Sequence, residues 1–290
     1  MRLLFVSLSL VILIAVAGFA AATINVYFMD VGHGDAILVQ SGACEWLIDT
    51  GYKCAWPSAS TCRSLFGVVI APPIEYFILS HDHLDHYSAL DLFLDSCCVC
   101  TAWSSAAEGA MARIRQEATP SRPQCGDTAG IQLGKLAAGA PSPIDANGLR
   151  WAVLHPTTQF ASSAAGDNDM SLVLLLTYGA VAFLFPGDLQ SIPAGAQWRR
   201  PADVDVLVLK APHHGLSDSS TLELVRLFAP QLVVVSTDDL MPYTLPQIAG
   251  LGVPVLSTGT SGTIRVTTDG RAVWLTTDSL GGGALDFERP

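Results

Sequence analysis

The chain is built from short apolar runs separated by polar turn residues, and most of these runs have the length of a strand. Several lack polar residues at alternate positions, which indicates strands covered by other layers on both faces. In the first half such runs cover residues 24–29, 36–39, 46–48 and 76–79. In the second half they cover residues 151–154, 171–178, 181–185, 204–209 and 232–235.

Helical patterns lie between these runs, at residues 88–94, 108–117 and 221–228. Strands interspersed with helices predict an α/β protein in which two sheets face each other and helices cover the outside. With 290 residues, of which 50% are hydrophobic and 14% charged, the chain can bury a large core. We therefore expect one domain over residues 23–290.

The first 22 residues have the pattern of an export signal. Arg2 precedes an apolar run that reaches about Ala20, and small residues follow it. This pattern predicts a cleaved signal peptide, with an uncleaved membrane anchor as the alternative because about twenty apolar residues can span a bilayer. Both interpretations place the body outside the cytoplasm, secreted or periplasmic, and after cleavage no membrane contact is expected.

The charge and the cysteines narrow the picture further. The formal net charge is −11, and we find no cluster of Lys and Arg, so tight nonspecific binding of nucleic acid is not expected. Exported chains meet oxidising conditions, so the seven cysteines predict disulfide bonds whose connectivity stays open. These cysteines are Cys44, Cys54, Cys62, Cys97, Cys98, Cys100 and Cys125. The oligomeric state also stays open.

The most informative segment is HDHLDH at residues 81–86, directly after an apolar run. It offers three imidazoles and two carboxylates within six residues, and these are the ligands that zinc and similar divalent ions accept. Other polar residues also stand where apolar runs end: Asp49, Asp188, and His213 with His214. Several strand ends that deliver such groups to one edge predict a shared site with two metal ions.

These motifs, taken in order, resemble the metallo-β-lactamase superfamily: LIDTG with Asp49, HDHLDH, FPGDL with Asp188, and KAPHHG. The chain is more narrowly similar to the extracellular hydrolase domain of the ComEC/Rec2 competence proteins. That similarity rests on FMDVGHGDAILV at 28–39, DNDMSLVLLLTYG at 167–179 and LKAPHHG at 209–215. The resemblance implies a four-layer αββα sandwich of two mixed sheets flanked by helices.

The residues and the resemblance together give a set of candidate roles. Two divalent ions are expected, with zinc preferred and manganese as the alternative. Asp85, Asp188 and His214 are assigned to catalysis. We expect Asp49 to support the ligands by hydrogen bonds, Lys210 either to face substrate phosphate or to be a solvated strand end, and His33 to be structural. The expected metal ligands are His81, His83, Asp85, His86, Asp188 and His213, with a slight preference for His213 over His214.

One ligand of the superfamily has no clear counterpart, namely the histidine that precedes the Asp188 motif. Asp167 or Asn168 occupies roughly that place, and His155 is a more remote candidate. The first metal is therefore expected to bind less tightly than the second.

Three functions are compatible with these patterns. The preferred one is a secreted phosphodiesterase or nuclease-like hydrolase, which would act on a small-molecule or nucleic-acid phosphodiester. The alternatives are a hydrolase of a small ester, lactone or lactam, and a metal-stabilised binding domain without turnover.

Overall fold

The computed structural model describes residues 22–53, 73–96, 99–105, 108–117, 131–140, 148–157, 168–239, 243–279 and 285–286. Its strands form two mixed sheets that face each other. The first sheet has nine strands, in the order β15 (Leu285–Asp286), β14 (Val273–Thr277), β13 (Ile264–Thr268), β1 (Ile24–Phe28), β2 (Ile37–Ser41), β3 (Cys44–Ile48), β4 (Ile74–Leu79), β5 (Val99–Ser105) and β6 (Gln132–Leu136). The second has six, in the order β12 (Val255–Ser257), β11 (Leu232–Val235), β10 (Val206–Lys210), β9 (Val181–Phe185), β8 (Val173–Tyr178) and β7 (Arg150–His155).

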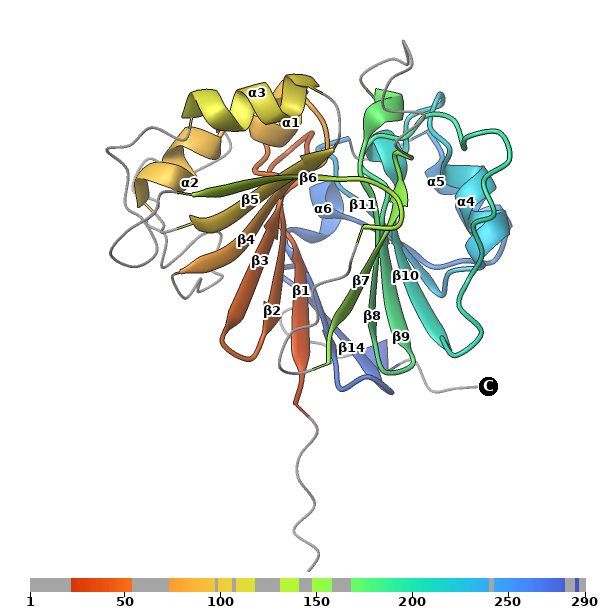
Figure 1. The fold of residues 1–290 in the computed structure, drawn as a ribbon. Coiled ribbons are helices and arrows are strands. Elements are labelled where there is room, and N and C mark those ends of the chain that lie inside the picture. Colours follow the sequence, from red (N-terminus) through yellow and green to blue (C-terminus); the bar gives the residue numbers. More distant parts are fainter. Residues whose placement is uncertain are drawn as a thin grey trace, which may run out of the picture.

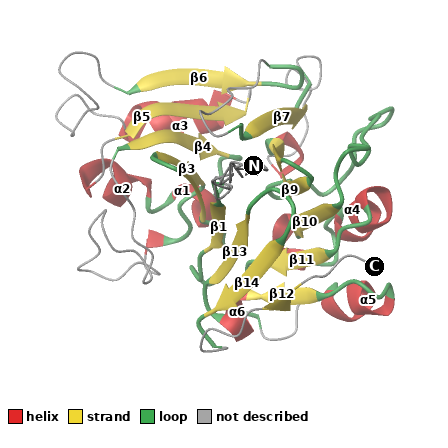
Figure 2. Cartoon of the chain, turned by 90° about the horizontal axis from the view of Figure 1, so that it is seen from below, coloured by secondary structure: helices red, strands yellow, loops and turns green. Residues whose placement is uncertain are grey.

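Helices cover the outer face of each sheet (Figure 1). Those beside the first sheet are α1 (Leu84–Tyr87), α2 (Leu90–Ser96) and α3 (Glu108–Glu117). Those beside the second are α4 (Thr221–Phe228) and α5 (Leu245–Gly250), which lie together in the view from below (Figure 2). The short helix α6 (Thr258–Ser261) follows β12. This is the αββα sandwich that the sequence predicts.

Three apolar clusters hold these layers together. The central one lies between the sheets and joins Phe28 of β1 to Phe185 of β9, whose ring centroids are 6.2 Å apart. The second joins the first sheet to α2 and α3, for example through Leu47 and Phe93. The third joins the second sheet to α4 and α5, and it includes Phe228. The strands β8, β9 and β11 bury both faces, so their runs are apolar throughout, whereas β1, β13 and β14 alternate buried and half-buried residues.

The structure confirms most predicted elements within a residue or two, including α3 and α4. The predicted helix at 88–94 corresponds to α2, which begins two residues later at Leu90, and the short helix α1, which was not predicted, ends just before it at Tyr87. Across the residues that the structure describes, every helix is too short or too polar to cross a lipid bilayer. The predicted signal segment at 1–22 lies outside the described residues except for residue 22, so the prediction of export stays a prediction. Five of the cysteines also lie outside the described residues, and Cys100 in β5 is disulfide-bonded.

Candidate metal centre

The two sheets deliver polar strand ends to one edge of the sandwich. In the first sheet, β3 and β4 are parallel neighbours, followed by Asp49 and by the HDHLDH segment. In the second sheet, β9 and β10 are parallel neighbours, followed by Asp188 and by the turn Pro212–Gly215. The carboxyl ends of parallel strands are the edge at which α/β sheets build their binding sites.

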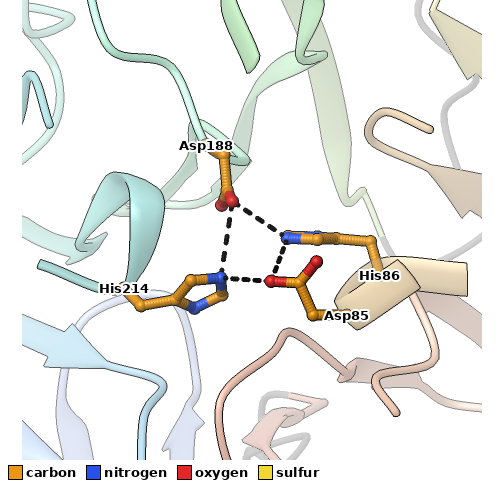
Figure 3. Close-up of side chains that lie close together, drawn as sticks. All are labelled: Asp85, His86, Asp188 and His214. Atoms are coloured by element: carbon orange, nitrogen blue, oxygen red, sulfur yellow. Dashed lines mark hydrogen bonds and ion pairs between the residues drawn. The ribbon is translucent and has the colours of Figure 1, made fainter. Parts of the chain in front are cut away.

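Four side chains from both sheets form a first candidate ligand group, here called the four-residue group: Asp85, His86, Asp188 and His214 (Figure 3). His214 Nε2 lies 3.2 Å from Asp85 Oδ2 and 3.4 Å from Asp188 Oδ2. His86 Nε2 lies 3.2 Å from the same Asp188 oxygen. The Asp85 side chain is 16% exposed whereas the other three are buried, so solvent reaches the group from the Asp85 side.

A second candidate group, here called the three-residue group, contains His81, His83 and again Asp188. His81 Nε2 lies 3.7 Å from Asp188 Oδ2. One carboxylate oxygen, Asp188 Oδ2, therefore faces both groups. The structure thus brings together five of the six predicted ligands, and it places Asp188 where a bridging carboxylate would lie.

Hydrogen bonds to residues outside the two ligand groups orient the imidazoles. Asp49 Oδ2 lies 2.7 Å from His86 Nδ1 and accepts a 2.6 Å bond from Ser80 Oγ. Ser80 Oγ also lies 3.0 Å from His81 Nδ1. Since an ionised Asp49 carboxylate can only accept, His86 donates from Nδ1 to it, and this bond directs Nε2 toward the site. Asp49 therefore occupies the supporting position that the sequence predicts, with a left-handed φ of 57° that permits its inward turn.

Neighbouring charges shift the pKa values of the site residues in the direction opposite to that of burial. Burial alone would lower the pKa of His214, but the nearby Asp188 and Asp85 raise it to about 9. Burial would also lower the pKa of His86, and Asp188 and Asp49 outweigh it, so the pKa lies well above its ordinary value. For Asp188, burial favours a higher pKa, but the two imidazolium groups hold it well below the usual range. Cationic imidazoles thus neutralise the buried carboxylates here, which is the role that a metal cation would take over.

The structure reverses the predicted preference between the two adjacent histidines. His214 belongs to the four-residue group, and its Nδ1 donates to the carbonyl oxygen of Ser236 at 2.9 Å. His213 points elsewhere, with Nδ1 3.0 Å from Asp218. Both residues adopt left-handed backbone angles, with φ of 48° and 53°. His214, not His213, is therefore the candidate ligand.

A second correction concerns Lys210, which neither faces substrate nor lies in solvent. Its side chain is 1% exposed, and Nζ pairs with Asp35 and donates to the carbonyl oxygen of Gly187 at 3.3 Å. The strand β10 ends at this residue, and the side chain turns into the sandwich behind Asp188. The ammonium is thus paired with Asp35 rather than available to a substrate phosphate in this structure.

The candidates for the missing histidine also need correction. Asn168 lies beside His213 rather than in either ligand group, with Nδ2 3.4 Å from His213 Nε2. His155 donates from Nε2 to the carbonyl oxygen of Asp169 at 2.8 Å, since an amide oxygen can only accept. Asp167 lies outside the described residues. Within the described part of the chain, the second group therefore has three members.

Sequence reasoning missed the importance of Asp35 and Ser80. Asp35 is buried beneath the site, with Oδ2 3.8 Å from His86 Nδ1 and Oδ1 3.9 Å from His214 Nδ1. Its loop packs closely on the ligand segment, because a Cβ at Gly34 would lie 2.5 Å from the Asp85 carbonyl oxygen. The signal was available, since Asp35 immediately precedes an apolar run. His33, expected to be structural, places its ring 4.3 Å from that of His214.

This fold and this site define an αββα protein with a His- and Asp-rich candidate metal centre. The chain belongs to the metallo-β-lactamase superfamily, because the model of that family matches residues 29–237. Members of the superfamily are mostly metal-dependent hydrolases, and they bind dinuclear metal centres.

Individual relatives are distant. The uncharacterized protein YcaI of Escherichia coli (strain K12) is 25% identical over 234 residues, which is 77% of this chain and 26% of that protein. The chain thus spans about a quarter of the relative's length. Zn²⁺-bound PqqB from Methylobacterium extorquens superposes with a TM-score of 0.51 at 11% identity, covering 81% of this chain and 97% of that one.

A further solved structure, the E377D variant of the CmlA β-hydroxylase, has a TM-score of 0.51 at 13% identity. The match covers 84% of this chain and 53% of that one. CmlA is described as a diiron enzyme from Streptomyces venezuelae. At these identities, the two structures establish the shared fold.

Proposed function

We propose that this protein is a metal-dependent hydrolase that cleaves phosphodiesters with two divalent cations, preferably zinc. The observation that carries the proposal is a set of buried polar atoms at the shared centre of the two groups. Nε2 of His81 is buried and has no hydrogen-bond partner among the described residues, and Nε2 of His86 is buried with only the Asp188 carboxylate, at 3.2 Å, beside it. Buried polar groups are rarely left unsatisfied without a reason, and a bound cation would satisfy these nitrogens.

The donor set fits such ions. The four-residue group would hold one ion, and His81 with His83 would hold the other, with Asp188 shared. Imidazole and carboxylate donors suit zinc, and the zinc-bound PqqB structure supports this choice, with manganese as the alternative. When bound, two such ions lower the pKa of water and act as Lewis acids toward the substrate.

The chain's own residues would orient the reaction. The buried imidazoles are fixed by Asp49, Ser80 and the Ser236 carbonyl, so their Nε2 atoms stay aimed at the centre. Asp85 is the member of the four-residue group that solvent reaches, and we assign it to accepting a proton during turnover. Asp188 and His214 complete the predicted catalytic set by holding the centre together.

The phosphodiester preference rests on the similarity of the quoted motifs to the ComEC/Rec2 hydrolase domain. One observation favours the second candidate, a hydrolase of small esters, lactones or lactams. Around the site, Lys210 is buried against Asp35, and Arg113 pairs with Asp82 at 3.3 Å, while Asp238 contributes negative charge beside His33. A polyanion would meet little free positive charge there.

Metal content and turnover measured on the same samples test the proposal. We expect two equivalents of metal, counted by mass spectrometry for zinc, manganese and iron, and hydrolysis of bis(p-nitrophenyl) phosphate. Asp188→Ala should lose both, whereas Asp91→Ala, in an exposed pair with Lys53, should keep both. Metal with turnover of p-nitrophenyl acetate alone would favour the second candidate. Metal without any turnover would indicate a metal-stabilised binding domain, and a protein that binds no metal would refute the proposal.

We further propose that the protein works outside the cytoplasm, after export by residues 1–22. Cell fractionation with N-terminal sequencing of the mature chain tests this. A cytoplasmic chain that retains Met1 would contradict export.

A further inference from the structure

The buried Lys210–Asp35 pair lies directly behind the carboxylate that the two ligand groups share. The two side chains are 1% and 2% exposed. Lys210 Nζ also lies 3.6 Å from Asp188 Oδ1. Lys210 comes from the end of β10 in the second sheet, whereas Asp35 comes from the loop before β2 in the first. The pair therefore bridges the two sheets beneath the site.

This arrangement distinguishes the two oxygens of Asp188. Oδ2 faces the imidazoles, at 3.2 Å from His86 Nε2, 3.4 Å from His214 Nε2 and 3.7 Å from His81 Nε2. Oδ1 faces the Lys210 ammonium on the other side. Because the two oxygens are chemically equivalent, Lys210 fixes the plane of the carboxylate: a partial rotation that turned both oxygens toward the imidazoles would lose this attraction.

Stability alone does not account for the pair. Burying an ammonium and a carboxylate costs desolvation free energy, and apolar replacements of similar volume are often equally stable or more stable. The pair also leaves Asp35 Oδ1 without a hydrogen-bond partner among the described residues. A buried pair that is imperfectly satisfied and lies against a candidate bridging ligand indicates a role at that ligand.

We propose that Lys210, held by Asp35, is a positioning residue that fixes Asp188 with Oδ2 toward both ligand groups. Held in this way, Asp188 would offer one oxygen to both ligand groups, and the ammonium would oppose a rotation that turned both oxygens toward one of them. This inference rests on the proposed metal-dependent function. It assigns Lys210 no contact with substrate.

A double-mutant comparison separates positioning from folding. The variants are Lys210→Met, Asp35→Asn and the double variant Lys210→Met/Asp35→Asn, with Lys53→Met/Asp91→Asn as a matched exposed pair. Each is measured for thermal unfolding without metal, for the visible spectrum of the Co²⁺-substituted protein, and for kcat and KM on bis(p-nitrophenyl) phosphate. Each single variant leaves one buried charge unpaired and should be destabilised. The double variant removes both charges and should unfold near the wild-type temperature.

If Lys210 positions Asp188, the folded double variant should still show a Co²⁺ spectrum that differs from that of the wild type. Its kcat should be lower than that of the wild type by about tenfold or more, while its KM should stay within about threefold. The exposed-pair control should match the wild type throughout. A double variant that recovers both the spectrum and kcat would show that the pair only supports folding, and would overturn the positioning role.

The two proposals fail in different ways. A wild type that binds Co²⁺ but hydrolyses no phosphodiester would refute the proposed function, while the spectra would still decide the positioning role. A wild type that binds no metal would overturn both.

Discussion

The two candidate ligand groups differ in how the fold builds them. Both groups take two residues from the HDHLDH segment after β4 and share Asp188, which follows β9 of the second sheet. The four-residue group alone adds a second residue from that sheet's loops, His214 after β10. It is therefore tied more firmly to the packing of the two sheets than the three-residue group is.

The burial of the imidazoles and the hydrogen bonds that hold them also differ between the two groups. His86 and His214 are fully buried, and each is held through Nδ1 by an acceptor, the Asp49 carboxylate or the Ser236 carbonyl. In the other group His81 is buried, but His83 is only partly so. Since outer hydrogen bonds tune metal affinity, we expect the four-residue group to bind its ion more tightly.

The largest effect is expected at the residue that the groups share. Asp188→Ala should abolish binding of both ions and lower phosphodiester turnover by more than about a hundredfold. Loss of a residue that only hydrogen-bonds a metal ligand costs up to about a hundredfold, and loss of a shared ligand should cost more. Metal analysis and steady-state kinetics measure both quantities. Asp218→Ala, at an exposed carboxylate beside His213, provides the control. Retention of both ions in Asp188→Ala would remove the basis for a shared ligand.

The adjacent histidines offer a matched pair for the second prediction. His214→Ala should lose the tightly bound ion, because it removes an imidazole of the four-residue group. His213→Ala should change metal affinity by less than about threefold, since His213 interacts with Asp218 outside both groups. Competition with a chelator measures the affinities. A reversed result would restore our sequence-based preference for His213.

A smaller effect is expected for the three-residue group. His83→Ala should remove the weaker ion and leave the tighter one in place, because His83 belongs to that group alone. Zinc titration followed by calorimetry should resolve two classes of site in the wild type and one in the variant. If the variant instead lost the tighter class, the ranking of the groups would be wrong.

The sequence predicts much of this site because strand ends carry its ligands. Asp49, His81 and Asp188 each follow an apolar run within a few residues, and parallel neighbouring strands must bring such ends to one edge. The αββα layering follows likewise from runs too apolar to face water. These features depend on local pattern together with a general rule of topology.

The remainder depends on tertiary geometry that local pattern does not encode. His213 and His214 are the same residue type at adjacent positions, and their backbone angles in the turn decide which one points inward. Lys210 is a charged residue at a strand end, where solvent is the usual environment, and its burial depends on Asp35 from the other sheet together with Asp188 and the Gly187 carbonyl oxygen.

The smallest expected effect is a pH dependence that distinguishes the metal-free from the metal-bound four-residue group. In the metal-free protein burial lowers the pKa of His214, but Asp188 and Asp85 raise it to about 9, above the ordinary value of about 6.5. A group whose pKa is raised by folding stabilises the fold fully below its unfolded pKa, and this contribution is lost as pH rises through the folded pKa.

The melting temperature of the metal-free protein should therefore fall by a few degrees between about pH 6.5 and 9. Zinc affinity should rise over the same window, because bound protons compete with the metal for the imidazole. Thermal unfolding with and without chelator, and calorimetry in buffers of different ionisation enthalpy, measure the two trends. His214→Ala should lessen the fall in the metal-free profile, and the raised pKa of His86 should account for what remains of it. A melting temperature that stays constant or rises in the metal-free wild type would mean that these imidazoles are neutral without metal.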